Sequence, residues 1–421
     1  MAISLPPDAG NRVAALSELG LDIAALSFLP ILALVPHGTA PLIGVAGVLA
    51  LGLAVPAGQA SLRPLRGFGL LSAALILWGL VSAAWAVEPG RSLLIAARLS
   101  GLFAAGFALV AASPRITSPR RLFVCSLAGL GLALVLAEIQ FGTGGLLTQP
   151  FFVRPFKPPQ LNQIENGVAI VALPMAAILL ARRRAIGALL LVIGAAAAVV
   201  HLVGTAGKFA LGIAAGVAVL YYFIGRPLAR ATAVFCIVVI LTAPLTFPQL
   251  ARIPAVLDTA AEIKFSAWHR LMIWSFVGDR IAERPLFGWG LDAARSIPGG
   301  QQVIRLGAVL LPLHPHNAAL QVWLELGIPG AVLFALLIAG IWFALANARW
   351  PPLFTAAAAG SLMTVLVASM GTYGVWQEWW IATLWFSLFL VLQMGRLASE
   401  SAGAPVPVSP LPAPQPARSH T

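Results

Sequence analysis

Residues 326–346 read LGIPGAVLFALLIAGIWFALA, a stretch without a single charged side chain. At the rise of an α-helix, such a run can cross the roughly 30 Å hydrocarbon core of a bilayer. Similar runs recur along the chain of 421 residues, of which 60% are hydrophobic and 10% charged. Soluble domains typically carry about a quarter charged residues. The sequence therefore predicts an all-α, polytopic membrane protein.

Twelve membrane spans are predicted from the apolar runs, at residues 21–37, 40–58, 67–86, 91–112, 121–141, 166–181, 185–203, 207–225, 231–248, 326–346, 353–371 and 377–395. Arginine follows every even-numbered span: Arg63, Arg66, Arg115, Arg120, Arg121, Arg182, Arg183, Arg184, Arg226, Arg230, Arg349 and Arg396. Because cytoplasmic loops are enriched in basic residues, these exits and both termini are predicted to be cytoplasmic. The same bias explains the formal charge of +12, which therefore does not indicate nucleic-acid binding.

The chain divides into four parts. Residues 1–248 hold spans one to nine with short loops, and residues 326–395 hold spans ten to twelve. Residues 249–325 form a large, charged periplasmic loop with amphipathic helices. Helical spacing between Glu262 and Ile281 predicts a helix that ends before Pro285, and a further short helix is expected at Asp292. Residues 396–421 are rich in Pro, Ser and Ala and are predicted to form a disordered cytoplasmic tail.

Several cations are predicted on the periplasmic side, against the orientation bias: Arg154, Lys157, Lys208, Arg270 and Arg295. Each has a simple alternative explanation, since Lys208 can extend from a helix end towards the interface and Arg154 and Lys157 can lie in water. Their common location on one face instead indicates an anionic partner.

Two histidines flank a proline in LPLHPHNAAL, residues 311–320. Pro315 fits the first position of a helix, which would place His316 in the first turn. There the helix dipole keeps the imidazole neutral, as a general base acting on a hydroxyl group requires. His316 can also be a helix cap or an interfacial polar residue. A zinc site is not predicted, because His-x-His supplies two ligands and nothing nearby completes the set.

The sequence contains no nucleotide-binding fingerprint and no indication of another cofactor. An activated, lipid-linked substrate therefore fits better than a cytosolic nucleotide donor.

Two motifs resemble those of the bacterial O-antigen ligases. The family signature is a histidine and a small polar residue, followed after nine positions by two glycines that are separated by two residues. This sequence has a similar pattern: His316–Asn317 is followed, after nine residues, by Gly327–Ile328–Pro329–Gly330. The family also has an Arg-x-x-x-Trp element, which Arg270-LMI-Trp274 resembles. A Pro-Leu-x-Gly-x-Gly element follows it in the family, and Arg284-PLFGWG-Leu291 is similar to that element. The twelve spans and the large loop after the ninth also match, so the resemblance covers essentially the whole chain.

This resemblance implies a fold like that of a C-type glycosyltransferase, in the bacterial inner membrane and with its active site on the periplasmic face. It also implies transfer of a polysaccharide from undecaprenyl diphosphate to a lipid A–core hydroxyl, without a metal or other cofactor. Displacement in one step would invert the anomeric configuration. Besides the donor and acceptor, the partners would be membrane lipids.

Individual residues carry over from the family motifs. His316 matches the essential histidine, as the base, and Arg270 matches an essential loop arginine. Lys208 stands where the family has arginine, and lysine lacks the bidentate fork that arginine offers to phosphate. The residues expected to hold the diphosphate are Lys208, Arg270, Arg154, Lys157 and Arg295. The residues expected to support the site are His314, Asn317, Trp274, Gly327 and Gly330.

Related activities remain alternatives. An O-antigen or exopolysaccharide polymerase would use the same donors, and a protein O-oligosaccharyltransferase would differ in its acceptor. A transporter for lipid-linked glycans would favour ionisable residues near the membrane midplane, whereas the charges here gather at one face. The glycine–proline–glycine sequence is expected to end a helix that begins near Pro315, and Pro329 to begin the tenth span.

Overall fold

The computed structural model describes residues 7–54, 66–150, 155–202 and 204–401, and within these ranges it is helical, with no strand. Twelve apolar helices lie at the predicted spans: α1 (Pro7–Leu34), α2 (Thr39–Ala54), α3 (Arg66–Val81), α4 (Pro89–Ala112), α5 (Pro119–Gly142), α6 (Asn162–Ala181), α7 (Ala185–His201), α8 (Thr205–Ile224), α9 (Arg226–Leu250), α12 (Ala318–Asn347), α13 (Pro352–Gly371) and α14 (Glu378–Ser401). In the described ranges, 11 helices are long and apolar enough to cross a membrane, and α7 is a shorter apolar helix. The prediction of an all-α, polytopic membrane protein is confirmed.

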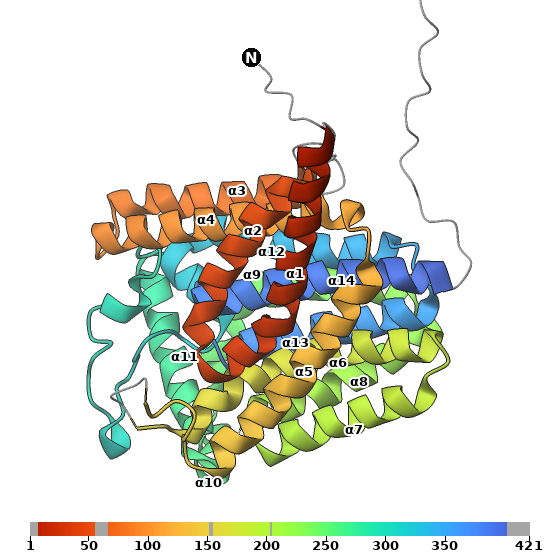
Figure 1. Cartoon of the computed structure of the whole chain (residues 1–421). Coiled ribbons are helices and arrows are strands. Elements are labelled where there is room, and N and C mark those ends of the chain that lie inside the picture. Colours follow the sequence, from red (N-terminus) through yellow and green to blue (C-terminus); the bar gives the residue numbers. More distant parts are fainter. Residues whose placement is uncertain (1–6, 55–65, 151–154, 203, 402–421) are drawn as a thin grey trace, which may run out of the picture.

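The spans pack around α6 and α14, which are the most enclosed of them. Helices α9 and α12 pack against each other, as do α8 and α13 (Figure 1). Tight contacts need small residues, and a Cβ at Gly106 of α4 would lie 2.0 Å from the Trp385 ring of α14. The core is therefore formed by close helix–helix packing inside the bundle.

The end of α14 corrects one expectation from the sequence. Residues 396–401 are helical rather than part of a disordered tail. The Arg396 guanidinium donates to the carbonyl oxygens of Ser113, at 2.6 Å, and Ile116, at 3.4 Å. These bonds tie the last turns of α14 to the residues that follow α4. The rest of the predicted tail, residues 402–421, lies outside the described residues.

Connections that follow odd-numbered spans meet at one end of the bundle. The Val87 N–H, after α3, donates to the Trp289 carbonyl at 3.2 Å. Tyr373, after α13, donates its hydroxyl to the Asn162 carbonyl at the start of α6, at 2.7 Å. This sharing of one end is the alternation that the basic exits predict, and the assignment of that end to the periplasm stays a prediction.

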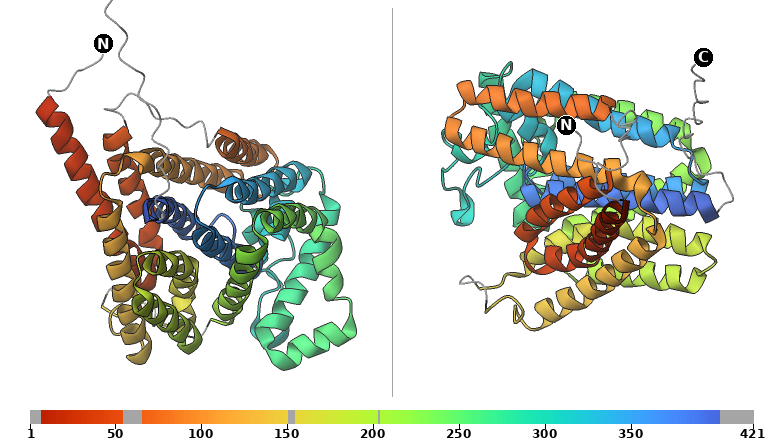
Figure 2. Two further views of the ribbon diagram at one scale, coloured as in Figure 1. Left: turned by 90° about the vertical axis from the view of Figure 1, so that its right-hand side faces the viewer. Right: turned by 45° about the horizontal axis from the view of Figure 1, so that its top comes forward.

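The long segment between α9 and α12 covers this end of the bundle. It contains α10 (Pro254–Ile263), α11 (Phe265–Glu283) and the short 3₁₀ helices η6 (Ala293–Ser296) and η7 (Arg305–Gly307). Lys264, with φ −167°, is extended and separates α10 from α11, so the predicted helix begins at Phe265 rather than near Glu262. Helix α11 lies across the ends of the spans (Figure 1), and α10 and α11 lie to one side of the bundle (Figure 2). The expected short helix after Asp292 is η6.

Candidate functional site

The start of α12 lies later than the sequence predicts. Asn317 is its N-cap, and the Asn317 Oδ1 accepts a hydrogen bond from the Leu320 N–H at 3.1 Å. An asparagine cap satisfies one of the free amides of the first turn, which favours a helix that starts directly after Asn317. His316 lies before the cap, with a left-handed φ of 54°, and not in the first turn. The helix dipole is therefore not what keeps His316 neutral.

Burial and a hydrogen bond fix the state of His316 instead. Its Nδ1 lies 2.7 Å from the Thr372 carbonyl oxygen. Because a carbonyl can only accept, Nδ1 must carry the proton, which leaves the Nε2 lone pair free. Burial, and then the charge of Arg270, lower the pKa of His316 to about 4. His316 is thus a neutral imidazole that can accept a proton at Nε2.

His314 lies directly against His316. The His316 backbone N–H donates to the His314 Nδ1 at 3.3 Å, and the ring centroids lie 4.3 Å apart. Burial lowers the pKa of His314 to about 3. A Cβ at Gly374 would lie 3.0 Å from the His314 ring, so this close contact favours glycine there. His314 therefore helps to hold the left-handed backbone of its neighbour.

Helix α11 brings Arg270 and Trp274 to the histidines. These residues are four apart and so share one face of the helix. The Trp274 indole N–H donates to the Pro315 carbonyl at 3.0 Å. The Arg270 Nε is buried and has no hydrogen-bond partner among the described residues. Because the charge of Arg270 acts on His316, the site contains an arginine with unused donors next to a neutral imidazole.

Among the other predicted phosphate-binding cations, Arg295 lies close enough to His314 for its charge to act on that ring. Arg295 forms an ion pair with Asp292 at 3.4 Å. Lys157 and Lys208 are exposed, and no contact described in the structure joins either one to the histidines. Lys208 lies near Glu165, on which its charge acts. Arg154 lies outside the described residues.

The two glycine-containing motifs pair through their backbones. Gly327 breaks α12 with φ 61° and ψ −158°, a conformation that is essentially restricted to glycine. The Leu324 carbonyl accepts from the Trp289 N–H at 2.9 Å. The Glu325 carbonyl accepts from the Gly290 N–H at 2.8 Å. Helix α12 therefore consists of residues 318–326 and a longer span after the break, so the sequence correctly predicted the break but placed the first residue of the helix too early.

Close packing limits substitution at both motif glycines of α12. A Cβ at Gly327 would lie 2.4 Å from the Leu286 carbonyl oxygen. A Cβ at Gly330 would lie 2.2 Å from the Leu326 Cβ. The Ile328 N–H donates to the Pro285 carbonyl at 3.0 Å, so the new helix segment starts with a partner for its free amide.

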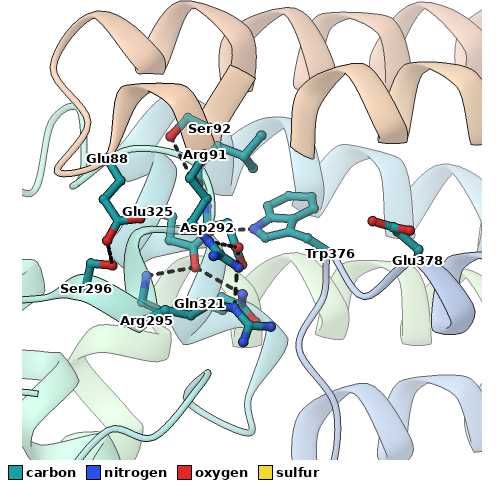
Figure 3. A network of polar contacts seen from close by, with 12 residues as sticks. Glu88, Arg91, Ser92, Asp292, Arg295, Ser296, Gln321, Glu325, Trp376 and Glu378 are labelled. Carbon is teal, nitrogen blue, oxygen red and sulfur yellow. Dashed lines mark hydrogen bonds and ion pairs between the residues drawn. The ribbon is translucent and has the colours of Figure 1, made fainter. Parts of the chain in front are cut away.

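A buried carboxyl group beside this break was not among the residues predicted from the sequence. Glu325 is completely buried and accepts hydrogen bonds from the Trp376 indole at 2.5 Å and from Gln321 at 3.0 Å (Figure 3). The available signal was a lone carboxylate in an otherwise apolar run. Asp292, which the sequence indicated as the start of a short helix, pairs with Arg91 at 2.6 Å in the same network.

Comparison with known proteins agrees with these motifs. Residues 166–335 match the family model of the O-antigen ligases. This region of the chain is similar to the O-antigen ligases. The matched region runs from α6 into α12 and contains Lys208, Arg270 and His316, and the match confirms the resemblance that the motifs indicated.

Relatives of similar length point to the same family. A candidate polysaccharide ligase of Rickettsia conorii is 27% identical over 340 residues, which cover 78% of this chain and 80% of the relative. Candidate polysaccharide ligases of Rickettsia bellii and Rickettsia typhi are 28% and 26% identical, each over 75% of this chain and 78% of the relative. No solved structure matches the chain.

Proposed function

We propose that this protein is a glycosyltransferase of the bacterial inner membrane that transfers a polysaccharide from undecaprenyl diphosphate to a hydroxyl group of lipid A–core on the periplasmic face. One observation carries the proposal: the Thr372 carbonyl accepts the His316 Nδ1 proton at 2.7 Å, which leaves Nε2 as a proton acceptor. The family resemblance supplies the identities of donor and acceptor, and the names of the relatives agree with a polysaccharide substrate.

In the proposed reaction, His316 Nε2 takes the proton of the acceptor hydroxyl. The hydroxyl oxygen then forms a bond to the anomeric carbon of the donor, and the bond from that carbon to the diphosphate oxygen breaks. The diphosphate leaves with the electron pair. Displacement in one step inverts the anomeric configuration.

Arg270 stabilises the departing diphosphate in this proposal. Its buried Nε lacks a partner among the described residues, and a guanidinium can donate two parallel hydrogen bonds to phosphate. Fixed positive charge at the leaving group lowers the barrier as negative charge develops there. Arginine can therefore take the role that a metal ion has in many glycosyltransferases. Lys208, Lys157, Arg154 and Arg295 are proposed to contribute further charge as the lipid-linked donor binds.

Two substitutions separate the proton acceptor from the diphosphate site. His316→Ala should lower single-turnover transfer by about 10² to 10⁴-fold, the usual contribution of general base catalysis, and leave donor affinity nearly unchanged. Arg270→Ala should weaken both donor binding and transfer, and Arg270→Lys should restore part of each because lysine lacks the fork. The exposed His37, at the α1–α2 connection, provides the control His37→Ala, which should match the wild type. Near-normal transfer by His316→Ala would refute the assignment of the base.

The choice of acceptor distinguishes the proposed ligase from related enzymes. Purified protein in liposomes would receive the lipid-linked donor with lipid A–core, with free glycan or with peptide. We expect product with lipid A–core. Transfer to glycan alone would indicate a polymerase, and transfer to peptide alone would indicate a protein O-oligosaccharyltransferase.

A further inference from the structure

Glu325 is a fully buried carboxyl group that no step of the proposed reaction uses. It accepts hydrogen bonds from the Trp376 indole N–H at 2.5 Å and from the Gln321 side-chain amide at 3.0 Å. The Asp292 backbone N–H donates to it at 2.6 Å (Figure 3). Three segments thus converge on one side chain: the first part of α12, the residues that precede η6 and the connection between α13 and α14.

The connection between α13 and α14, residues 372–377, reaches from Glu325 to His316. Its first residue, Thr372, accepts the His316 Nδ1 proton, and its fifth, Trp376, donates to Glu325. Between these two residues, the Val375 backbone N–H donates to the Gln321 Oε1 at 2.9 Å. A connection of six residues is therefore fixed at one end by the Glu325 network and contacts the imidazole at the other.

The other side of the network is anchored to the bundle. The Asp292 carboxylate forms ion pairs with Arg91 near the start of α4, at 2.6 Å, and with Arg295, at 3.4 Å. The Ser92 hydroxyl donates to the Leu291 carbonyl at 2.7 Å. Because these contacts fix the segment that donates to Glu325, the carboxyl group has little freedom to follow a shift of the connection.

We propose that Glu325 is a positioning residue for His316. By fixing the 372–377 connection, Glu325 keeps the Thr372 carbonyl on Nδ1 and so keeps the proton off Nε2. Without that carbonyl, a neutral imidazole can place its proton on either nitrogen, and the form with the proton on Nε2 cannot take one from a hydroxyl group. The role in transfer rests on the proposed function, in which His316 is the base.

Two substitutions test this positioning from its two sides. Glu325→Gln keeps the shape of the side chain but replaces one acceptor oxygen by an NH₂ group. That group would face the N–H groups that now donate to Glu325 and could not accept from them. Trp376→Phe keeps an aromatic ring and removes the N–H that holds the connection. Glu378→Gln is the matched control: Glu378 lies two residues after Trp376 and forms an ion pair with Arg98 at 2.8 Å, with a side chain that is 34% exposed.

The state of the His316 ring can be read without any substrate. The full chain, labelled with ¹⁵N-histidine in nanodiscs, gives ring-nitrogen resonances, and those of His316 are the ones lost in His316→Ala. The wild type and Glu378→Gln should show the proton on Nδ1. Glu325→Gln and Trp376→Phe should show a mixture of tautomers, with transfer reduced at least about tenfold and donor affinity within about twofold.

The outcomes separate the positioning role from the proposed function. A wild-type tautomer in both folded variants would overturn the positioning role, whatever the activity. A changed tautomer with unchanged transfer would support positioning and would show that His316 is not the base. If Glu325→Gln fails to fold, as judged by gel filtration and thermal unfolding, Trp376→Phe decides the question alone.

Discussion

At the scale of single residues, the environment of His316 determines how the protein should respond to pH. Burial and the Arg270 charge both disfavour the imidazolium, so the free protein keeps His316 neutral down to a pKa of about 4. A bound diphosphate would neutralise Arg270 and remove one of these two effects. The base should therefore become stronger when the donor is present.

This gives a prediction for the acid side of the pH profile. Protonation inactivates the base, so kcat/KM, which reports the free protein, should stay level as the pH falls through 6.5 and decline only near about 4. The acid limb of kcat, which reports the complex, should lie at higher pH. Transfer rates between pH 4 and 8, over a range of donor concentrations, would measure both. A kcat limb at or below that of kcat/KM would contradict the role given to Arg270.

At the scale of elements, the broken helix α12 provides a test through two of its own glycines. Gly327→Ala should destabilise the protein by at least about 2 kcal/mol, because alanine is strained at φ 61° and its Cβ would lie 2.4 Å from a carbonyl oxygen. Gly340, in the same helix, has open space around its Cβ position, so Gly340→Ala should be neutral or stabilising by up to about 1 kcal/mol. Thermal unfolding in one detergent compares the pair, and equal midpoints would exclude the strain at Gly327.

At the scale of the whole molecule, the spans were predictable and the site was predictable only in part. Each span is a local apolar run, so its length alone identifies it. Motif spacing predicted the break at Gly327 and the candidates His316 and Arg270. The bond from His316 to Thr372 joins residues in different helical connections, and no local pattern encodes it. Nor could the sequence show that the Lys208 side chain would be exposed.

Orientation is the prediction that belongs to this scale. Single cysteines at the exposed positions Arg183, Arg230 and Gln301 report both ends of the bundle. Intact cells treated with a membrane-impermeant maleimide should label Gln301→Cys and leave Arg183→Cys and Arg230→Cys unlabelled, since basic exits are cytoplasmic. The parent chain, with its two native cysteines, sets the background. The reverse pattern would place the histidines in the cytoplasm and exclude the proposed reaction.

The backbone pairing between residues 285–290 and the break in α12 also affects how these proteins can diversify. Each segment supplies hydrogen-bond partners for backbone groups of the other. A change in the backbone of one segment alone would therefore leave polar groups buried and unpaired. A chimera that takes only the large loop, residues 249–325, from a relative would combine residues 285–290 of one protein with the helix that follows the break in another. Recombination should keep this pairing intact when the exchanged block extends from Pro285 through Pro329, which makes this stretch, rather than the loop, the smallest block that carries both partners of the pairing.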